Sequence, residues 1–150
     1  MLNTINVTTQ QQLQDTFDLR ILVFVDEQGV PLEDELDEYD TLNAPCNHLL
    51  LTLDNTPIGC GRVRQVDGVG KLERIVVKKE NRGMGFGKAI VLGLEKRAIE
   101  MGLNQVKLHG QVQARGFYEN LGFAVLGDEF IEDGILHVVM TKQLQDVKDV

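Results

Sequence analysis

A glycine-rich segment constrains this chain more than any other part of its sequence. It follows a strand-like apolar run at 75–77 and precedes apolar residues at helical spacing over 90–101. At the start of a helix the unpaired backbone N–H groups and the helix dipole attract anions, and glycine has no Cβ to hold an anion away. The sequence therefore predicts a strand–loop–helix unit that binds a phosphorylated ligand. The loop comprises Arg82, Gly83, Met84, Gly85, Phe86, Gly87 and Lys88.

Two common phosphate-binding loops do not fit this segment. A Walker A loop would need glycine where Arg82 stands and Ser or Thr where Ala89 stands. A dinucleotide fingerprint, GxGxxG, would need a glycine or alanine where Lys88 stands. The pattern that remains is Gln or Arg followed by xxGxG, and it is met by Arg82, Gly85 and Gly87.

This pattern resembles motif A of the GCN5-related N-acetyltransferase (GNAT) superfamily. Residues 117–123 read FYENLGF and resemble the FYxxxGF segment of the same superfamily. Residues 20–31 and 132–137 resemble the first motif and the C-terminal signature of a subgroup of small bacterial acetyltransferases. Leu136 departs from that signature, which usually has proline there. The resemblance covers nearly the whole chain.

The resemblance implies a single α/β domain over residues 1–150, with a mixed sheet of about six to seven strands flanked by about four helices. The residue pattern independently indicates alternating strands and helices, without repeats or a linker. A capping box at 9–12 predicts the start of the first helix, which should end near Gln28. The expected strands are 5–7, 48–53, 58–64, 71–77, 106–109 and 135–140, and the later helices are 90–101 and 113–121.

The resemblance also implies that acetyl-CoA is the co-substrate. The loop N–H groups would hold its pyrophosphate, while Ile75, Val76 and Val77 would hydrogen-bond the pantetheine arm. Gln111 would make a further polar contact with that arm. A metal is not expected, because the two cysteines form no CxxC pair and the three histidines are scattered.

Acyl transfer to an amine needs a polarised thioester carbonyl and a proton for the departing thiolate. By resemblance Tyr118 is the proton donor, and the alternative is a packed aromatic residue. The carbonyl would be polarised by a backbone N–H near Val76 or Val77, where the strand is expected to bulge.

The reaction also needs a general base that makes the amine neutral. Glu73 is the candidate, because it lies on the strand that leads to the cofactor site and could act through water. Its alternative role is an ion pair with Arg62 or Arg64. The histidines are interpreted as ordinary strand residues: His48, His109 and His137.

Charge limits the partners of the chain. Twenty-three acidic residues against fifteen Lys and Arg give a net charge of −8, which repels nucleic acid and anionic membranes. The acceptor is expected to be a small-molecule or peptide amine. Acids crowd residues 26–40, and this segment is interpreted as solvent-facing, with an acceptor cleft as the alternative. The N-terminus has no signal-peptide pattern, so a cytoplasmic protein is expected.

Two other functions stay open at this point. A non-catalytic acyl-CoA-binding sensor would share the loop and use Tyr118 only for packing. An acyl-homoserine-lactone synthase is the second, because residues 20–27 also resemble the start of that related fold. Those synthases are usually longer and need a surface for an acyl carrier protein, whereas this acidic chain has no obvious basic docking patch. A homodimer is expected from the superfamily.

Overall fold

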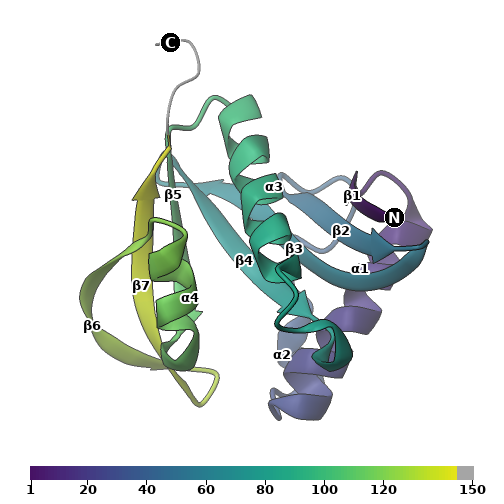
Figure 1. Ribbon diagram of the computed structural model, residues 1–150, viewed down its shortest axis with the longest axis horizontal. Helices are drawn as coiled ribbons and strands as arrows, with labels where there is room; N and C mark the ends of the chain where they lie inside the picture. The colour runs from purple at the N-terminus through teal and green to yellow at the C-terminus, as the bar shows by residue number, and fades with distance from the viewer. Residues whose placement is uncertain (145–150) are drawn as a thin grey trace.

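The computed structural model describes residues 1–144, and within that range the fold is a seven-stranded sheet with four α-helices (Figure 1). The strand order is β1-β2-β3-β4-β5-β7-β6. The predicted α/β class and mixed sheet are therefore confirmed. The strands are β1 (Leu2–Asn6), β2 (Asn47–Leu53), β3 (Thr56–Val66), β4 (Val69–Val77), β5 (Gln105–Gln111), β6 (Ala124–Glu132) and β7 (Ile135–Gln143). The α-helices are α1 (Gln10–Arg20), α2 (Leu32–Glu35), α3 (Phe86–Glu100) and α4 (Arg115–Asn120). The segment η1 (Ile21–Glu27) is a π-helix, and η2 (Lys79–Asn81) and η3 (Val112–Ala114) are short 3-10 helices.

The first helix starts at the predicted capping box. The Thr9 hydroxyl accepts the Gln12 N–H at 3.2 Å, and the Gln12 side chain accepts the Thr9 N–H at 3.1 Å. The helix does not stay α-helical to its end, because η1 is a π-helix. Helical spacing in the sequence predicted one continuous helix and could not show this widening. π-Helical segments are rare in proteins overall, but those that occur are often found at functional sites.

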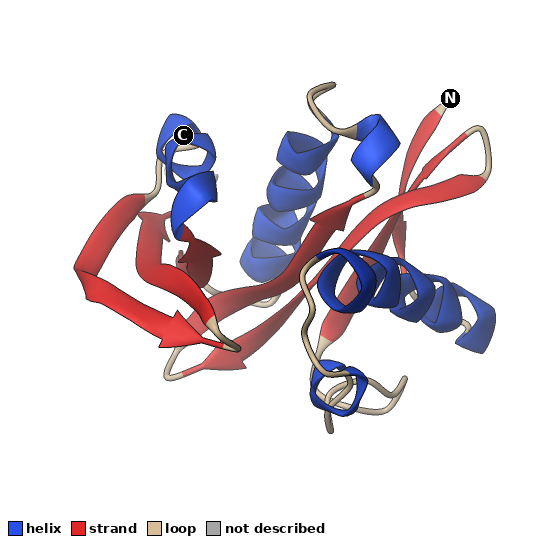
Figure 2. Cartoon of the chain, turned by 90° about the horizontal axis from the view of Figure 1, so that it is seen from below, coloured by secondary structure: helices blue, strands red, loops and turns tan. Residues whose placement is uncertain are grey.

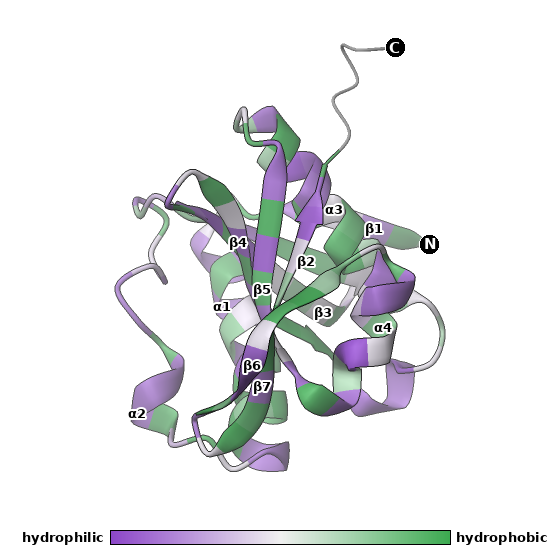
Figure 3. Ribbon diagram, turned by 90° about the vertical axis from the view of Figure 1, so that its left-hand side faces the viewer, coloured by the Kyte–Doolittle hydropathy of each residue, from purple (hydrophilic) through white to green (hydrophobic). Residues whose placement is uncertain are grey.

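Side chains alternate between the two faces of the sheet, and each face is covered by a long helix (Figure 2). Leu49 and Leu51 belong to the core under α3, whereas Leu50 belongs to the smaller core under α1 and η1. The helix α3 packs closely because β3 carries Gly61, where a Cβ would lie only 2.8 Å from a methyl group of Leu94. The same alternation of apolar and polar residues is visible along β5 (Figure 3).

The pairing of β4 with β5 creates the main opening in the sheet. These two strands pair in parallel over Gly70–Leu72 and Val106–Leu108 only, and the other described strand pairs are antiparallel. Beyond residues 72 and 108 the two strands carry no ladder and diverge. The divergence leaves backbone groups of the last part of β4 facing a cavity.

Three predictions about the fold need correction. The strand β6 was not expected, because most of its residues are exposed and its pairing with β7 is interrupted between residues 126 and 130. The bulge of β4 lies at Arg74 and Ile75 rather than near Val76 or Val77. Cys60 pairs with Val76 and Arg62 with Glu73, so two residues stand opposite Gly61, and Arg74 has a φ of 57°.

The third correction concerns the acidic segment, which is not uniformly solvent-facing. Glu35 and Asp40 are only 3% and 9% exposed. Arg20 contacts Glu35 at 2.8 Å and Asp40 at 2.6 Å, while Arg62 contacts Asp40 at 2.9 Å and Asp37 at 2.7 Å. These ion pairs fasten the segment to the sheet. The acids that are exposed as expected are Asp26, Glu27, Glu33, Asp34 and Glu38.

Two kinds of feature are absent from residues 1–144. No helix there is long and apolar enough to cross a membrane. No group of three or more His, Cys, Asp or Glu residues there could hold a metal ion.

Candidate active site

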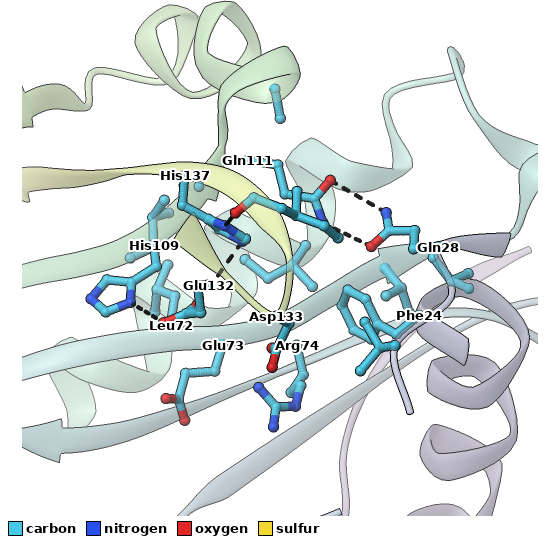
Figure 4. Close-up of a pocket in the computed structure, with 18 of the residues that line it drawn as sticks. Phe24, Gln28, Leu72, Glu73, Arg74, His109, Gln111, Glu132, Asp133 and His137 are labelled. Atoms are coloured by element: carbon cyan, nitrogen blue, oxygen red, sulfur yellow. Dashed lines mark hydrogen bonds and ion pairs between the residues drawn. The ribbon is translucent and has the colours of Figure 1, made fainter. Parts of the chain in front are cut away.

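A cavity of about 500 Å³ opens where β4 and β5 diverge (Figure 4). Its walls come from β4 from Lys71 onward, the end of β5, η1 and the residues after it, α2, the β6–β7 hairpin and α4. The structure thus brings together seven sequence-predicted residues from distant parts of the chain. These cavity-lining residues are Glu73, Ile75, Val76, Val77, Arg82, Gln111 and Tyr118.

The rest of the glycine-rich loop lies outside this cavity, at the start of α3. Gly83 and Gly85 have φ values of 80° and 84°, a conformation that favours glycine, and a Cβ at either position would meet nothing within 4 Å. Gly85 is the N-cap of α3. The first N–H groups of the helix have no partner within it, so this open end is suited to an anion.

Arg82 joins the loop to two elements of the cavity wall. Its Nε donates to the Val77 carbonyl oxygen at 2.9 Å, and its guanidinium contacts the Glu27 carboxylate at 2.9 Å. Arg82 therefore holds the loop against the end of β4 and the end of η1. Lys88 is exposed on the first turn of α3 and adds positive charge there.

Gln111 lies at the end of β5 and pairs with Gln28 at the end of the π-helix (Figure 4). The Gln111 amide nitrogen donates to the Gln28 oxygen at 2.8 Å, and the Gln28 nitrogen donates back at 3.3 Å. The polar groups of Gln111 that were expected to contact a cofactor arm are thus engaged with another part of the cavity wall.

Tyr118 belongs both to the cavity wall and to the core. Its side chain packs edge-on against Phe117 and Phe123, with ring centroids 5.0 and 5.8 Å away. Only 9% of the residue is exposed, and burial raises the pKa of its hydroxyl to about 12. A hydroxyl with this pKa keeps its proton at neutral pH, which suits a donor and not a base.

Glu73 shows the ion-paired arrangement that was the alternative to a base. Its carboxylate lies 2.8 Å from Arg64, 3.0 Å from Arg62 and 3.0 Å from Lys71. Burial opposes ionisation, but the hydrogen bond from Arg64 and the charges of Arg62 and Lys71 outweigh it and lower the pKa of Glu73 to about 2. A carboxylate with so low a pKa is a weak base.

Sequence reasoning missed a cluster on the opposite wall of the cavity. His109 from β5, Glu132 from β6 and His137 from β7 all line it (Figure 4). Nδ1 of His109 lies 3.0 Å from a Glu132 oxygen, and Nδ1 of His137 lies 2.7 Å from the Ile135 carbonyl oxygen. The sequence placed His109 on an alternating strand and His137 at the end of the EDGILH segment. Neither pattern shows that the two side chains line one cavity.

The sequence profile of the acetyltransferase (GNAT) domain matches residues 22–144. A Bacillus subtilis protein named as an acetyltransferase is 50% identical over 142 residues, covering 95% of this chain and 97% of that protein. The crystal structure of an N-acetyltransferase from Lactobacillus plantarum is similar, with a TM-score of 0.88 and 31% identity over 96% of this chain and 99% of that one.

A more distant neighbour shares the fold alone. The aminoglycoside 6'-N-acetyltransferase, whose crystal structure is a complex with coenzyme A, has a TM-score of 0.77 and 16% identity, covering 97% of this chain and 98% of that one. The profile match and the identity to the bacterial relative are each sufficient to assign the family. The chain belongs to the GNAT family of acetyltransferases.

Proposed function

We propose that this protein transfers the acetyl group of acetyl-CoA to a primary amine, by direct attack of the amine in a ternary complex. The observation that carries the proposal is the divergence of β4 from β5 beyond residue 72. Backbone groups of Ile75, Val76 and Val77 face the cavity there without a β5 partner. Backbone N–H and C=O groups seek hydrogen-bond partners, and the amide-containing pantetheine arm can supply them as an added strand would.

The glycine-rich loop is the proposed site of the coenzyme A pyrophosphate. It follows β4 closely, so one extended ligand could contact both β4 and the start of α3. The open surroundings of Gly83 and Gly85 and the exposed charge of Lys88 support this role. The coenzyme A found in the aminoglycoside acetyltransferase, a fold neighbour, supports the same ligand.

The chemistry that we propose divides between two walls of the cavity. A backbone N–H at the β4 bulge, at Ile75 or Val76, stabilises the oxyanion that forms when the amine attacks the thioester carbonyl. Tyr118 on α4 gives its proton to the departing thiolate. Glu73, held by three cations, serves chiefly to fix β4, because its low pKa makes it a weak base.

Two measurements on the purified protein test this function. A ligand at a hundred times its Kd stabilises a protein by about 2.7 kcal/mol, which for a chain of this size corresponds to roughly 5–10 °C in melting temperature. Coenzyme A and acetyl-CoA should give such a shift, while ATP and NAD should not. Acetyl-CoA should then release free thiol in the presence of a suitable amine.

The outcomes separate the competing functions. Equal stabilisation by ATP would contradict the proposed ligand. Stabilisation by acetyl-CoA without thiol release for any amine in a broad panel would indicate the non-catalytic sensor instead.

A further inference from the structure

The cavity wall opposite β4 contains an acid–base cluster that the proposed function has not yet used. We propose that His137 is the general base that removes a proton from the acceptor ammonium, with Glu132 stabilising the imidazolium that forms and His109 positioning Glu132. This inference rests on the proposed acetyl transfer and assigns its missing base.

The hydrogen bond of His137 determines which ring nitrogen is basic. Nδ1 lies 2.7 Å from the Ile135 carbonyl oxygen, and a carbonyl oxygen only accepts hydrogen bonds. Nδ1 therefore carries the hydrogen, and Nε2 of the neutral ring carries the lone pair. Within residues 1–144, Nε2 has no hydrogen-bond partner, because its nearest ionic neighbour, a Glu132 oxygen, is 3.9 Å away. The lone pair is thus free for a substrate proton.

Packing fixes the orientation of this ring. His137 is only 6% exposed and stacks on Phe130, with ring centroids 5.9 Å apart and an interplanar angle of 27°. Phe130 also meets His109 edge-on at 5.2 Å. Both histidines therefore contact one aromatic ring, and His137 lines the same cavity as Tyr118.

The two oxygens of Glu132 serve different partners. Oε1 accepts the hydrogen bond from Nδ1 of His109 at 3.0 Å, and Oε2 faces Nε2 of His137 (Figure 4). The hydrogen bond from His109 lowers the pKa of Glu132 and keeps it ionised. When His137 takes a proton, its Nε2–H⁺ faces a carboxylate that is already negative and already oriented.

The comparison with Glu73 favours His137 as the base. Glu73 is bound by three cations, whereas His137 lines the cavity and its Nε2 has no hydrogen-bond partner among the described residues. Imidazole is the most frequent general base in enzymes near neutral pH. The other titratable or charged groups that line the same cavity are Lys71, Glu73 and Arg74 on β4, Asp34 and Glu35 on α2, Arg82 in the loop, Tyr118 on α4, and Asp133 in the β6–β7 turn.

Each proton transferred in the reaction has a donor and an acceptor among the substrate, His137, Tyr118 and solvent. The ammonium gives one proton to Nε2 of His137, and the neutral amine attacks the thioester carbon to form the C–N bond. The C–S bond then breaks, and the thiolate takes the proton of Tyr118. The protonated amide nitrogen returns a proton to the tyrosinate. One proton remains on His137 and passes to solvent when the products leave.

The variant His137→Asn tests this assignment. The Asn amide nitrogen can replace Nδ1 as the donor to the Ile135 carbonyl, but the variant has no basic nitrogen. At neutral pH, kcat/KM for the amine should fall by about 10²–10⁴-fold. The acidic limb of the wild-type pH–rate profile should be replaced by a steady rise that follows deprotonation of the free amine. Melting temperature and coenzyme A affinity should stay close to wild type.

A second variant covers the case in which His137→Asn fails to fold. Glu132→Gln removes the charge that stabilises the imidazolium, so the acidic limb should move to lower pH, which a purely structural role of Glu132 would not cause. An unmoved limb would overturn the assignment. An unchanged pH profile in folded His137→Asn would also overturn it, as would loss of the limb in Glu73→Gln but not in His137→Asn. A wild-type protein that releases no thiol with any amine would instead refute the proposed function itself.

Discussion

Asp40 is the centre of the buried ion-pair network that anchors the segment between α1 and β2. Its carboxylate accepts hydrogen bonds from Arg20 at 2.6 and 3.0 Å, from Arg62 at 2.9 Å and from the Asp37 backbone N–H at 2.8 Å. Both guanidinium groups are only 1% exposed. Replacing Asp40 with alanine therefore leaves two buried positive charges with less compensation and no access to water.

The expected cost follows from this arrangement. Removing one partner from a buried ion pair costs about 3–5 kcal/mol, because the remaining charge stays buried. Asp40→Ala should lie in this range and not exceed it, because Arg20 and Arg62 keep Glu35, Asp37 and Glu73 as partners. For a chain of this size each kcal/mol corresponds to about 2–4 °C, so the melting temperature should fall by roughly 6–20 °C.

Urea unfolding of the purified protein measures this cost directly. Glu38→Ala is the matched control, because Glu38 is an exposed acid two residues away and its loss should change stability by less than about 0.5 kcal/mol. A loss below about 1 kcal/mol for Asp40→Ala would place this carboxylate in the range of a solvated surface pair. That result would refute the buried-network reasoning.

Three further predictions concern the loop, the proton donor and acid stability. Gly85→Val should abolish the thermal shift with coenzyme A. The control Gly127→Val in β6, where φ is 82° and valine is strained to a similar degree, should keep the shift. A retained shift in folded Gly85→Val would contradict the loop assignment. Tyr118→Phe should lower kcat by about 10²-fold or more and leave coenzyme A affinity unchanged, and full kcat where chemistry limits turnover would make Tyr118 a packing residue. The pKa of Glu73 is lowered to about 2, so its ion pairs contribute stability that is complete above its unfolded pKa of about 4.3 and is lost as the pH falls toward 2. Glu73→Gln should therefore flatten the decline of the urea midpoint across this pH range.

The features that follow local rules could be predicted from the sequence. The capping box at Thr9 and Gln12 depends on residues three positions apart, and it forms as expected. The glycine-rich loop was recognisable because several glycines stand between a strand and a helix in the sequence. In the structure Gly83 and Gly85 adopt positive φ at the start of that helix. Strands with buried faces, such as β2, were found because several of their residues are apolar.

The features that depend on distant partners could not be predicted. Nothing in an acidic run shows that Asp40 meets Arg20 and Arg62, which lie about twenty residues away on either side. The bulge at Arg74 depends on how β3 and β4 register, and the exposed strand β6 has little hydrophobic pattern. His137 gains its candidate role only because the β6–β7 hairpin turns it toward the same cavity as β4.

Acetyl transfer itself provides the most direct test of the central claim. The protein would be incubated with acetyl-CoA carrying a labelled acetyl group and with a panel of small amines and peptides. The mass of each acceptor would then be measured by mass spectrometry. We expect at least one amine to gain the labelled acetyl group in an amount equal to the free thiol released. Binding of acetyl-CoA without labelling of any acceptor and without thiol release would contradict it.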